Sequence, residues 1–374
     1  MGEIFTEERS KVIMILLTYS CNLDCVYCYE HNRTNHSMKI DSTTVRSIIE
    51  EEVKNSYKTY KHLIIHFMGG EPLLCFDIIK DTCEWIESKE WPINIILSIT
   101  TNGTLFSNYK DWFRCHSDIL KVVLSVDGNK FMQDVNRSGS SKLIDLDFFI
   151  ATWPDSKIKM TISPYTVNHV AEGVMYLHKK GVKRIEANLA LGPSINWTDN
   201  HVKQYRQELR KLISFYLSNP DYTPVSMLNI DVSKVVSSFD WRKRCSCGED
   251  FVCYDVDGKI YPCHLFTPIT LSPNEMDQYK RLNFNFKDRS LFGSKQCEKC
   301  IIRRCCNRCP GMNYLYTGTL NITPPIFCII SQIEFLSTCT LLHNKILLKQ
   351  SIPNKEIIAN VLNIINAAIN NKKE

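Results

Sequence analysis

The sequence lacks the features that would direct a chain to a membrane or out of the cell. Its first residues, MGEIFTEERSK, mix acidic and basic side chains and contain no apolar stretch, so we expect no signal peptide. Apolar runs such as VIMILL are much shorter than the ~20 residues that span a bilayer. No internal repeat or low-complexity tract is present. We therefore expect a cytoplasmic protein without a membrane partner.

Clustered charge of one sign is also missing. The 45 Lys and Arg residues are scattered and nearly balanced by 40 Asp and Glu, which gives a formal net charge of +5. Without a basic patch, we expect no nucleic-acid partner. A length of 374 residues exceeds one ordinary hydrophobic core and predicts at least two domains.

Cysteine is the residue in excess, with 17 copies. An odd number without a secretion signal argues against a disulfide scaffold. Most of these cysteines fall between Cys245 and Cys339. Close cysteine spacings in a cytosolic protein are more typical of metal ligands than of bridges.

The first half of the chain alternates between two kinds of segment. Strands are predicted over residues 12–19, 62–68, 93–101, 119–126, 157–163 and 184–191. Helices are predicted over residues 41–57, 75–90 and 168–181, with Asp41 as an N-cap and Gly181 as a C-cap. This alternation predicts an α/β fold with a parallel sheet. Six strands are fewer than the eight of a closed barrel, so we expect a partial (β/α)6 barrel whose ligands gather at the C-terminal strand ends.

The second half follows a different pattern. A helix is predicted over residues 200–219, and Pro220 and Pro224 mark a linker. Residues 255–263 predict a hairpin, and helices follow over 328–349 and 354–370. The predicted domains are the partial barrel (1–199), a helical bridge (200–244), a small cysteine-rich α+β domain (245–340) and a helical tail (341–374).

The loop CNLDCVYC after the first strand holds three cysteines, Cys21, Cys25 and Cys28. A structural zinc site needs four ligands, whereas three thiolates on a [4Fe–4S] cluster leave one iron open. The Cys-x3-Cys-x2-Cys spacing resembles that of the radical S-adenosylmethionine (SAM) superfamily, and Tyr27 matches its aromatic position. The resemblance implies that SAM binds the open iron and is cleaved to a 5′-deoxyadenosyl radical. The alternatives are a zinc site or three buried thiols.

Further motifs extend the resemblance over residues 12–193. The stretch MGGEP resembles the family's GGEP motif, in which Gly69 and Gly70 permit close approach and Glu71 is the charge partner of the SAM amino group. The stretches TTNGTL and LSVDG follow the third and fourth strands, where the family binds the ribose and carboxylate of SAM. The residues that these later matches implicate are Asn102, Ser125, Asp127, Arg137 for the SAM carboxylate, and Leu191 near adenine.

The later cysteines resemble a SPASM domain, which implies two auxiliary [4Fe–4S] clusters; the alternative is structural zinc. One cluster is expected on Cys297, Cys300, Cys305 and Cys328, although the adjacent Cys306 could replace Cys305. The other is expected on Cys247, Cys263 and Cys309, with Cys245, Cys253 or no protein group as its fourth ligand. The remaining cysteines lie in helical patterns and are expected to be buried apolar residues: Cys75, Cys83, Cys115 and Cys339.

SPASM enzymes include two branches that act on peptides. Anaerobic sulfatase maturases oxidise Cys or Ser to formylglycine and carry an aspartate base after the hairpin cysteine, where this chain has His264. The other branch crosslinks or epimerises ribosomally made precursor peptides (RiPPs), and we favour it; a non-catalytic iron–sulfur electron-transfer protein is a third alternative. His264 is the candidate catalytic base. The expected partners are the precursor peptide, a separate leader-binding protein or the helical bridge in that role, and an electron donor of the flavodoxin or ferredoxin type.

Overall fold

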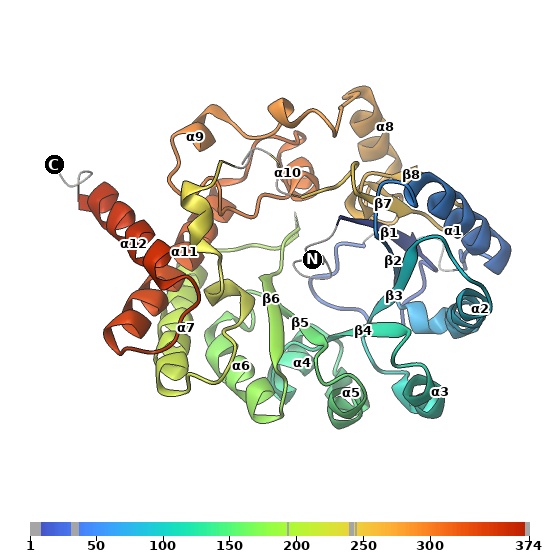
Figure 1. The fold of residues 1–374 in the computed structure, drawn as a ribbon, viewed down its shortest axis with the longest axis horizontal. Coiled ribbons are helices and arrows are strands. Elements are labelled where there is room, and N and C mark those ends of the chain that lie inside the picture. The colour runs from blue at the N-terminus through green and yellow to red at the C-terminus, as the bar shows by residue number, and fades with distance from the viewer. Residues whose placement is uncertain (1–8, 31–36, 193, 239–242, 244, 371–374) are drawn as a thin grey trace. The chain divides into compact units, whose positions relative to one another are not determined.

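The computed structural model describes residues 9–30, 37–192, 194–238, 243 and 245–370 (Figure 1). The chain divides into two compact units, each formed by segments that are distant in sequence. The first unit comprises residues 1–126, 137–158 and 246–287, and the second comprises residues 127–136, 159–245 and 288–374.

The first unit contains a mostly parallel sheet with the strand order β4-β3-β2-β1-β7-β8. Its strands are β1 (Ser10–Leu16), β2 (His62–Met68), β3 (Asn94–Thr101), β4 (Leu120–Ser125), β7 (Phe251–Tyr254) and β8 (Ile260–Tyr261). Its helices are α1 (Ser42–Ser56), α2 (Phe76–Glu87), α3 (Lys110–Cys115), α5 (Leu146–Thr152) and α8 (Pro273–Arg281). Helices α1, α2 and α3 follow one side of strands β1 to β4 (Figure 1).

The predicted strand and helix ends agree closely with this architecture. Asp41 caps α1, and its carboxylate accepts a hydrogen bond from the Thr44 amide at 2.9 Å. Strand β1 is almost entirely buried, as expected for a strand covered on both faces of a parallel sheet. Gly181 follows the last turn of α6 (Val170–Lys179) with φ +99°, which suits glycine at a helix C-terminus.

The hairpin near residue 258 is confirmed, but its place in the sheet could not be foreseen. Strand β7 pairs parallel to β1, with Cys253 opposite Met14, and β8 returns antiparallel to β7. The Tyr19 hydroxyl donates to the Asp255 carboxylate at 2.7 Å, across 236 positions in the sequence. This pairing brings the hairpin cysteines beside the strand that leads into the three-cysteine loop.

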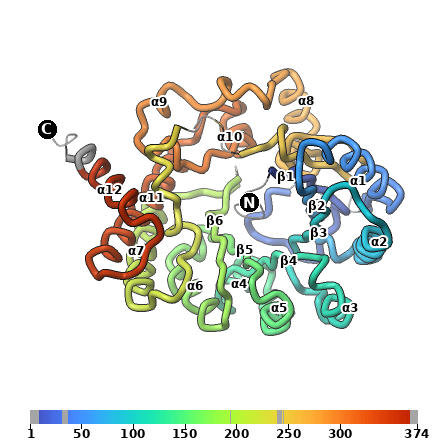
Figure 2. The backbone as a smooth tube through the Cα atoms, viewed as in Figure 1, coloured from blue at the N-terminus to red at the C-terminus, as the bar shows by residue number. Residues whose placement is uncertain are grey.

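The second unit contains the neighbouring strands β5 (Lys157–Ile162, of which residues 159–162 belong here) and β6 (Arg184–Leu189). Its helices are α4 (Lys130–Asn136), α6, α7 (Asp199–Ser218), α9 (Lys295–Glu298), α10 (Pro310–Thr317), α11 (Pro325–Leu347) and α12 (Lys355–Asn370). Helices α7, α11 and α12 lie side by side (Figure 2).

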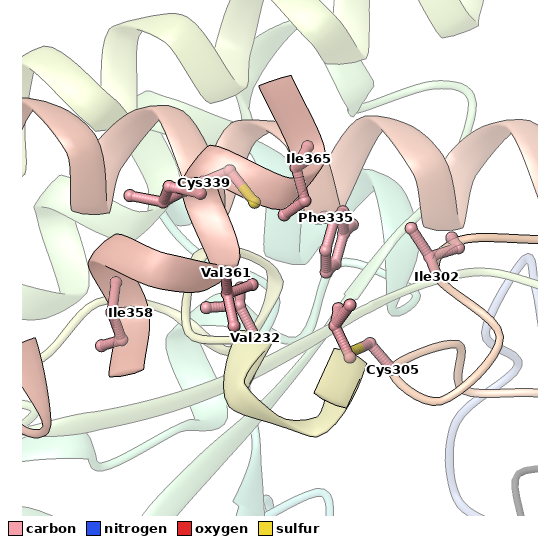
Figure 3. Packing of buried hydrophobic residues seen from close by; sticks show 10 residues of the cluster. Val232, Ile302, Cys305, Phe335, Cys339, Ile358, Val361 and Ile365 are labelled. Carbon is pink, nitrogen blue, oxygen red and sulfur yellow. The ribbon is translucent and has the colours of Figure 1, made fainter. Parts of the chain in front are cut away.

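One apolar core joins segments that the sequence assigned to different domains. Val232 from the predicted bridge packs with Phe335 of α11 and Val361 of α12, and Ile302 and Cys305 complete the cluster from the cysteine-rich region (Figure 3). The division into bridge, cysteine-rich domain and tail stays a proposal, and this shared core ties all three to the second unit.

Helix α11 is long and apolar enough to pass a length-and-composition test for a membrane span, and it is the one described helix that does. It nevertheless contains Glu334 and Lys345. Its buried face includes Phe335, Cys339 and Leu341, which are typical of a helix that packs within a protein core.

Glu334 links α11 to α7 and makes stability depend on pH. Its carboxyl accepts a hydrogen bond from the Tyr205 hydroxyl at 2.7 Å, and burial raises the pKa of Glu334 to about 7. The folded state therefore keeps a proton that the unfolded chain loses above pH ~4.5. The free energy of unfolding should fall as pH rises from about 4.5 to 7. Glu334→Gln should stabilise the protein at pH 8 by about 1–3 kcal/mol, a range limited by the partial exposure of the side chain. At pH 4.5 the substitution should have little effect, because the folded carboxyl is already neutral there.

Thermal unfolding across this pH range measures the difference. Glu356→Gln, at an exposed position of α12, is the matched control and should be nearly neutral at every pH. A Glu334→Gln effect that does not change with pH would contradict the assignment.

Candidate active site

The three-cysteine loop follows directly on β1, at the C-terminal edge of the sheet in the first unit. Cys21, Cys25 and Cys28 are all partly exposed, and none of them forms a disulfide. A turn brings the last two together, because the Cys28 amide donates to the Cys25 carbonyl at 3.0 Å. Tyr27 in this turn lies under the Arg137 guanidinium, 5.4 Å from the ring centroid.

Gly69 and Gly70 hold the end of β2 against the segment that leads into this loop. The Gly70 amide donates to the Thr18 carbonyl at 2.9 Å, and the Glu71 amide donates to the Ser20 carbonyl at 2.8 Å. A Cβ atom on Gly69 would lie 2.3 Å from the Thr18 oxygen, and one on Gly70 would lie 2.1 Å from the Ser20 oxygen. Only glycine permits this approach of the two backbone segments.

Gly70→Ala should therefore disturb both stability and the cysteine loop. We expect a loss of about 2–3 kcal/mol in the free energy of unfolding, because the clash is with backbone atoms that cannot rotate away. Chemical denaturation measures this loss. Gly192→Ala is the matched control, since its added Cβ would meet no atom closer than 3.9 Å. Equal effects of the two substitutions would refute the packing argument.

Glu71 connects the ends of β2 and β3 beneath the loop. Its side chain is 1% exposed and accepts hydrogen bonds from the Thr101 hydroxyl at 2.6 Å, the Asn102 amide at 2.8 Å and the Leu73 amide at 3.0 Å. Burial raises the pKa of Glu71, while these hydrogen bonds and the charge of Arg137 act in the opposite direction. Besides its predicted contact with SAM, Glu71 thus organises the protein itself.

Asn102 joins the end of β3 to the cysteine loop. The Asn102 side-chain nitrogen donates to the Asn22 side-chain oxygen at 2.8 Å, and the Asn22 side-chain nitrogen donates to the Thr104 hydroxyl at 2.8 Å. The Asn102 side-chain oxygen in turn accepts from the Thr104 hydroxyl at 2.7 Å. Asn22 is a supporting residue that sequence reasoning missed, because nothing in its spacing marks it.

Arg137 is also tied to the loop. The neighbouring Ser138 hydroxyl accepts a hydrogen bond from the Asp24 amide at 2.9 Å and donates to the Asp24 carbonyl at 2.7 Å. Ser125 ends β4 and is nearly buried. The first unit therefore brings most of the predicted SAM residues to one edge of the sheet, although their contact with SAM stays a prediction.

Two predicted SAM residues belong to the second unit. Asp127 is completely buried, and its carboxylate accepts a hydrogen bond from the Thr161 amide of β5 at 2.8 Å. This contact gives Asp127 a structural task within the unit. Leu191 follows β6 and is partly exposed, and its contact with adenine stays a prediction. Beside it, the Tyr316 hydroxyl donates to the Gly192 carbonyl at 2.6 Å and fixes the strand end.

The hairpin cysteines of the first unit are buried. Cys247, Cys253 and Cys263 are all under 9% exposed. Burial raises the pKa of Cys253, and the charge of Cys263 adds to this effect. The Cys263 sulfur lies 3.4 Å from His264 Nδ1, and the His264 ring lies 5.5 Å from the ring of Tyr29. Tyr29 directly follows Cys28, so it places an aromatic ring between the loop and the hairpin.

Four cysteines of the second unit influence one another electrostatically. Burial raises the pKa of Cys328 to about 11, and the charges of Cys306, Cys297 and Cys300 contribute. Burial also raises the pKa of Cys306, against the charge of Arg308. The buried Arg308 opposes these upward shifts, because a cation favours the thiolate, the form that ligates iron.

Cys305 points elsewhere. Its sulfur contacts the Asp231 carbonyl at 3.5 Å, and the side chain is 4% exposed within the apolar core, beside Phe335 and Cys339 (Figure 3). That Cys305 is the third ligand of this set stays a prediction, but its burial in the apolar core favours the alternative, Cys306, whose charge acts on Cys328. Adjacent residues on an irregular segment point in different directions, and the distant α11 and α12 decide which one is buried.

The remaining cysteines separate into two kinds. Cys75, Cys83 and Cys339 are buried as predicted, whereas Cys115 at the end of α3 is exposed, and that prediction was wrong.

Cys309 and Cys245 influence each other electrostatically in the second unit. Burial, and to a smaller extent the charge of Cys245, raises the pKa of Cys309 to about 11.

The donor chemistry fits iron–sulfur clusters. The three-cysteine loop offers three partly exposed thiols, and the segment that leads into it packs against Gly69 and Gly70. The second unit offers four thiols that influence one another and are influenced by Arg308: Cys297, Cys300, Cys306 and Cys328. Within the described residues, no three His, Cys, Asp or Glu side chains converge as the ligands of a single metal ion do. None of the seventeen cysteines forms a disulfide.

Comparison with known sequences agrees with this chemistry. The sequence model described as "Radical SAM superfamily" matches residues 15–205. The chain is 24% identical to a cysteine-type anaerobic sulfatase-maturating enzyme of Clostridium perfringens, over 77% of this chain and 86% of that protein. It is 21% identical to the radical SAM cyclopropyl synthase TigE of Paramaledivibacter caminithermalis, over 83% and 70% respectively. It is 30% identical to an uncharacterized protein of Methanocaldococcus jannaschii, and that match covers 48% of this chain and 62% of the other protein.

Solved structures show the same fold. Native anSMEcpe with bound AdoMet matches with a TM-score of 0.70 at 18% identity, over 89% of this chain and 98% of that chain. Streptococcus suis SuiB bound to precursor peptide SuiA matches with a TM-score of 0.59 at 16% identity, over 86% and 76% respectively. At these identities the likeness concerns the fold alone: a mixed α/β fold with a parallel sheet of six or more strands, as the sequence predicted.

Proposed function

This chain belongs to the radical SAM superfamily, and from that premise we propose that it modifies a ribosomally made precursor peptide by crosslinking or epimerisation. The family uses SAM and a [4Fe–4S] cluster, and named relatives of this chain are maturating or synthase enzymes. The finer assignment depends on the residue after Cys263, which is His264 where the sulfatase-maturing branch has an aspartate base.

Cys21, Cys25 and Cys28 would hold the core cluster. When bound, this group supplies one-electron cleavage of SAM to methionine and a radical that removes a hydrogen atom from a peptide carbon. The nearly buried Arg137 guanidinium would pair with the SAM carboxylate through a bidentate fork. Glu71 and Asn102 would maintain the loop geometry through the hydrogen bonds that join the strand ends. The protein thereby supplies orientation and exclusion of water.

We assign the second auxiliary cluster to Cys297, Cys300, Cys306 and Cys328, because these thiols share one electrostatic environment. For the first auxiliary cluster, the proposed ligands are Cys247, Cys263 and Cys309. Its fourth position is left to Cys245, to Cys253 or to a non-protein ligand.

A peptide partner is supported by what the related structures contain. The solved SuiB chain is bound to precursor peptide SuiA, and anSMEcpe to the Kp18Cys peptide. For this chain we propose a precursor peptide as substrate, with leader recognition by a separate protein or by the bridge around α7. The electron donor would be of the flavodoxin or ferredoxin type.

Sulfatase maturation is the second candidate, since the chain aligns with most of a sulfatase-maturating enzyme. Anaerobic co-expression in heavy water with a short peptide encoded beside the gene separates the candidates. A mass loss of two hydrogens indicates a crosslink, and one deuterium gained at an α-carbon indicates epimerisation. An unmodified peptide, together with formylglycine in a sulfatase-derived peptide, would overturn the proposal in favour of sulfatase maturation.

A further inference from the structure

The His264 ring lies where it can form a hydrogen bond with the Cys263 sulfur. Its Nδ1 atom lies 3.4 Å from the Cys263 sulfur, within reach of a hydrogen bond to sulfur. The ring packs at 45° against Tyr29, with the centroids 5.5 Å apart. These two contacts define both the location and the tilt of the imidazole.

The backbone around His264 is equally constrained. Its carbonyl accepts hydrogen bonds from the Thr267 hydroxyl at 2.6 Å and the Thr270 hydroxyl at 3.1 Å. The Cys263 carbonyl accepts from the Phe266 amide at 3.0 Å as a short 3-10 helix begins. Cys263 itself is 8% exposed. These hydrogen bonds fix the backbone from which the His264 side chain reaches the Cys263 sulfur.

We propose that His264 is a positioning residue that donates a hydrogen bond from Nδ1 to the Cys263 thiolate and thereby raises the reduction potential of the first auxiliary cluster. The inference rests on the proposed function, because it takes Cys263 as a cluster ligand. A metal-bound thiolate can only accept, so Nδ1 must carry the hydrogen. Hydrogen bonds to ligand sulfurs stabilise the more negative, reduced state of such a cluster.

The experiment uses the full chain with Cys21, Cys25 and Cys28 replaced by Ala, so that only the auxiliary clusters remain. Their reduction is followed by EPR during a redox titration. Cys263→Ser identifies the signal of the first auxiliary cluster. His264→Leu removes the donor, and we expect the ratio of reduced to oxidised cluster at a fixed potential to fall about tenfold, equivalent to ~59 mV for one electron. His264→Asn keeps an N–H near the Nδ1 position and should restore most of the potential.

A second measurement needs no substitution. In the wild-type protein with ¹⁵N-labelled histidine, ENDOR of the reduced auxiliary cluster should show one coupled histidine nitrogen, and the absence of this coupling would overturn the proposal. An unchanged potential in His264→Leu, with loss of peptide product, would also overturn it and make His264 a base. Loss of all iron from the variant without core cysteines would instead refute the cluster assignment, and the proposal with it. Failure of the wild-type enzyme to form 5′-deoxyadenosine would count against the proposed function alone.

Discussion

Cys28→Ala is expected to abolish the formation of 5′-deoxyadenosine from SAM under reducing conditions. The proposed core cluster would have three protein ligands, so the loss of one would leave too few thiolates to retain it. Without the cluster no residue of the chain can supply the electron, and the rate should fall by at least about 10⁶-fold, the lower range of enzymatic acceleration. Chromatography of the nucleoside product under anaerobic conditions measures this loss, and iron analysis should show that one cluster is missing.

The matched control is Cys115→Ser. Cys115 is an exposed thiol on α3, outside every proposed ligand set, so its loss should change neither iron content nor product formation. Residual activity in Cys28→Ala above one hundredth of wild type would show that the loop does not hold the reactive cluster. Loss of the auxiliary iron as well would indicate that the substitution unfolds the first unit.

Cys306→Ala and Cys305→Ala should have opposite consequences although the two residues are neighbours. Cys306 shares the electrostatic environment of Cys297, Cys300 and Cys328, so its removal should cost the iron of one auxiliary cluster. Cys305 packs in the apolar core of the second unit. Its replacement should retain all the iron and lower the free energy of unfolding by about 1–2 kcal/mol, through the loss of a buried sulfur.

Iron and acid-labile sulfide analysis, combined with thermal unfolding, distinguishes the two variants. Cys339→Ala offers a matched control, because this cysteine lies in the same apolar cluster and belongs to no ligand set. It should resemble Cys305→Ala in both measurements. The opposite result, with iron lost from Cys305→Ala and kept in Cys306→Ala, would restore the assignment that the spacing suggested.

Local spacing in the sequence was sufficient to propose a cluster site in the first unit. Cys21, Cys25 and Cys28 lie in one short loop, so their separation in sequence limits their separation in space whatever the rest of the chain does. The same holds for Gly69 and Gly70, whose role follows from the absence of a side chain. Strand–helix alternation similarly predicted the parallel sheet, because the periodicity of apolar residues records which faces are covered.

Other features depended on segments far apart in the sequence. The pairing of β7 with β1, and the hydrogen bond from Tyr19 to Asp255, join residues more than 230 positions apart. No local pattern distinguishes a hairpin that joins a sheet from one that stands alone. Tyr29 and His264 likewise meet only because this pairing forms.

The sequence by itself determined the family and the α/β architecture, and it provides the proposed core ligand set, since each depends on short-range spacing or on periodicity. The tertiary structure alone decided that Cys305 is buried in the apolar core, that Cys115 is exposed, and what the His264 ring touches. Cys305 illustrates the physical reason. The direction of a side chain on an irregular segment is determined by which apolar surfaces close over it, and those surfaces come from distant elements such as α11 and α12.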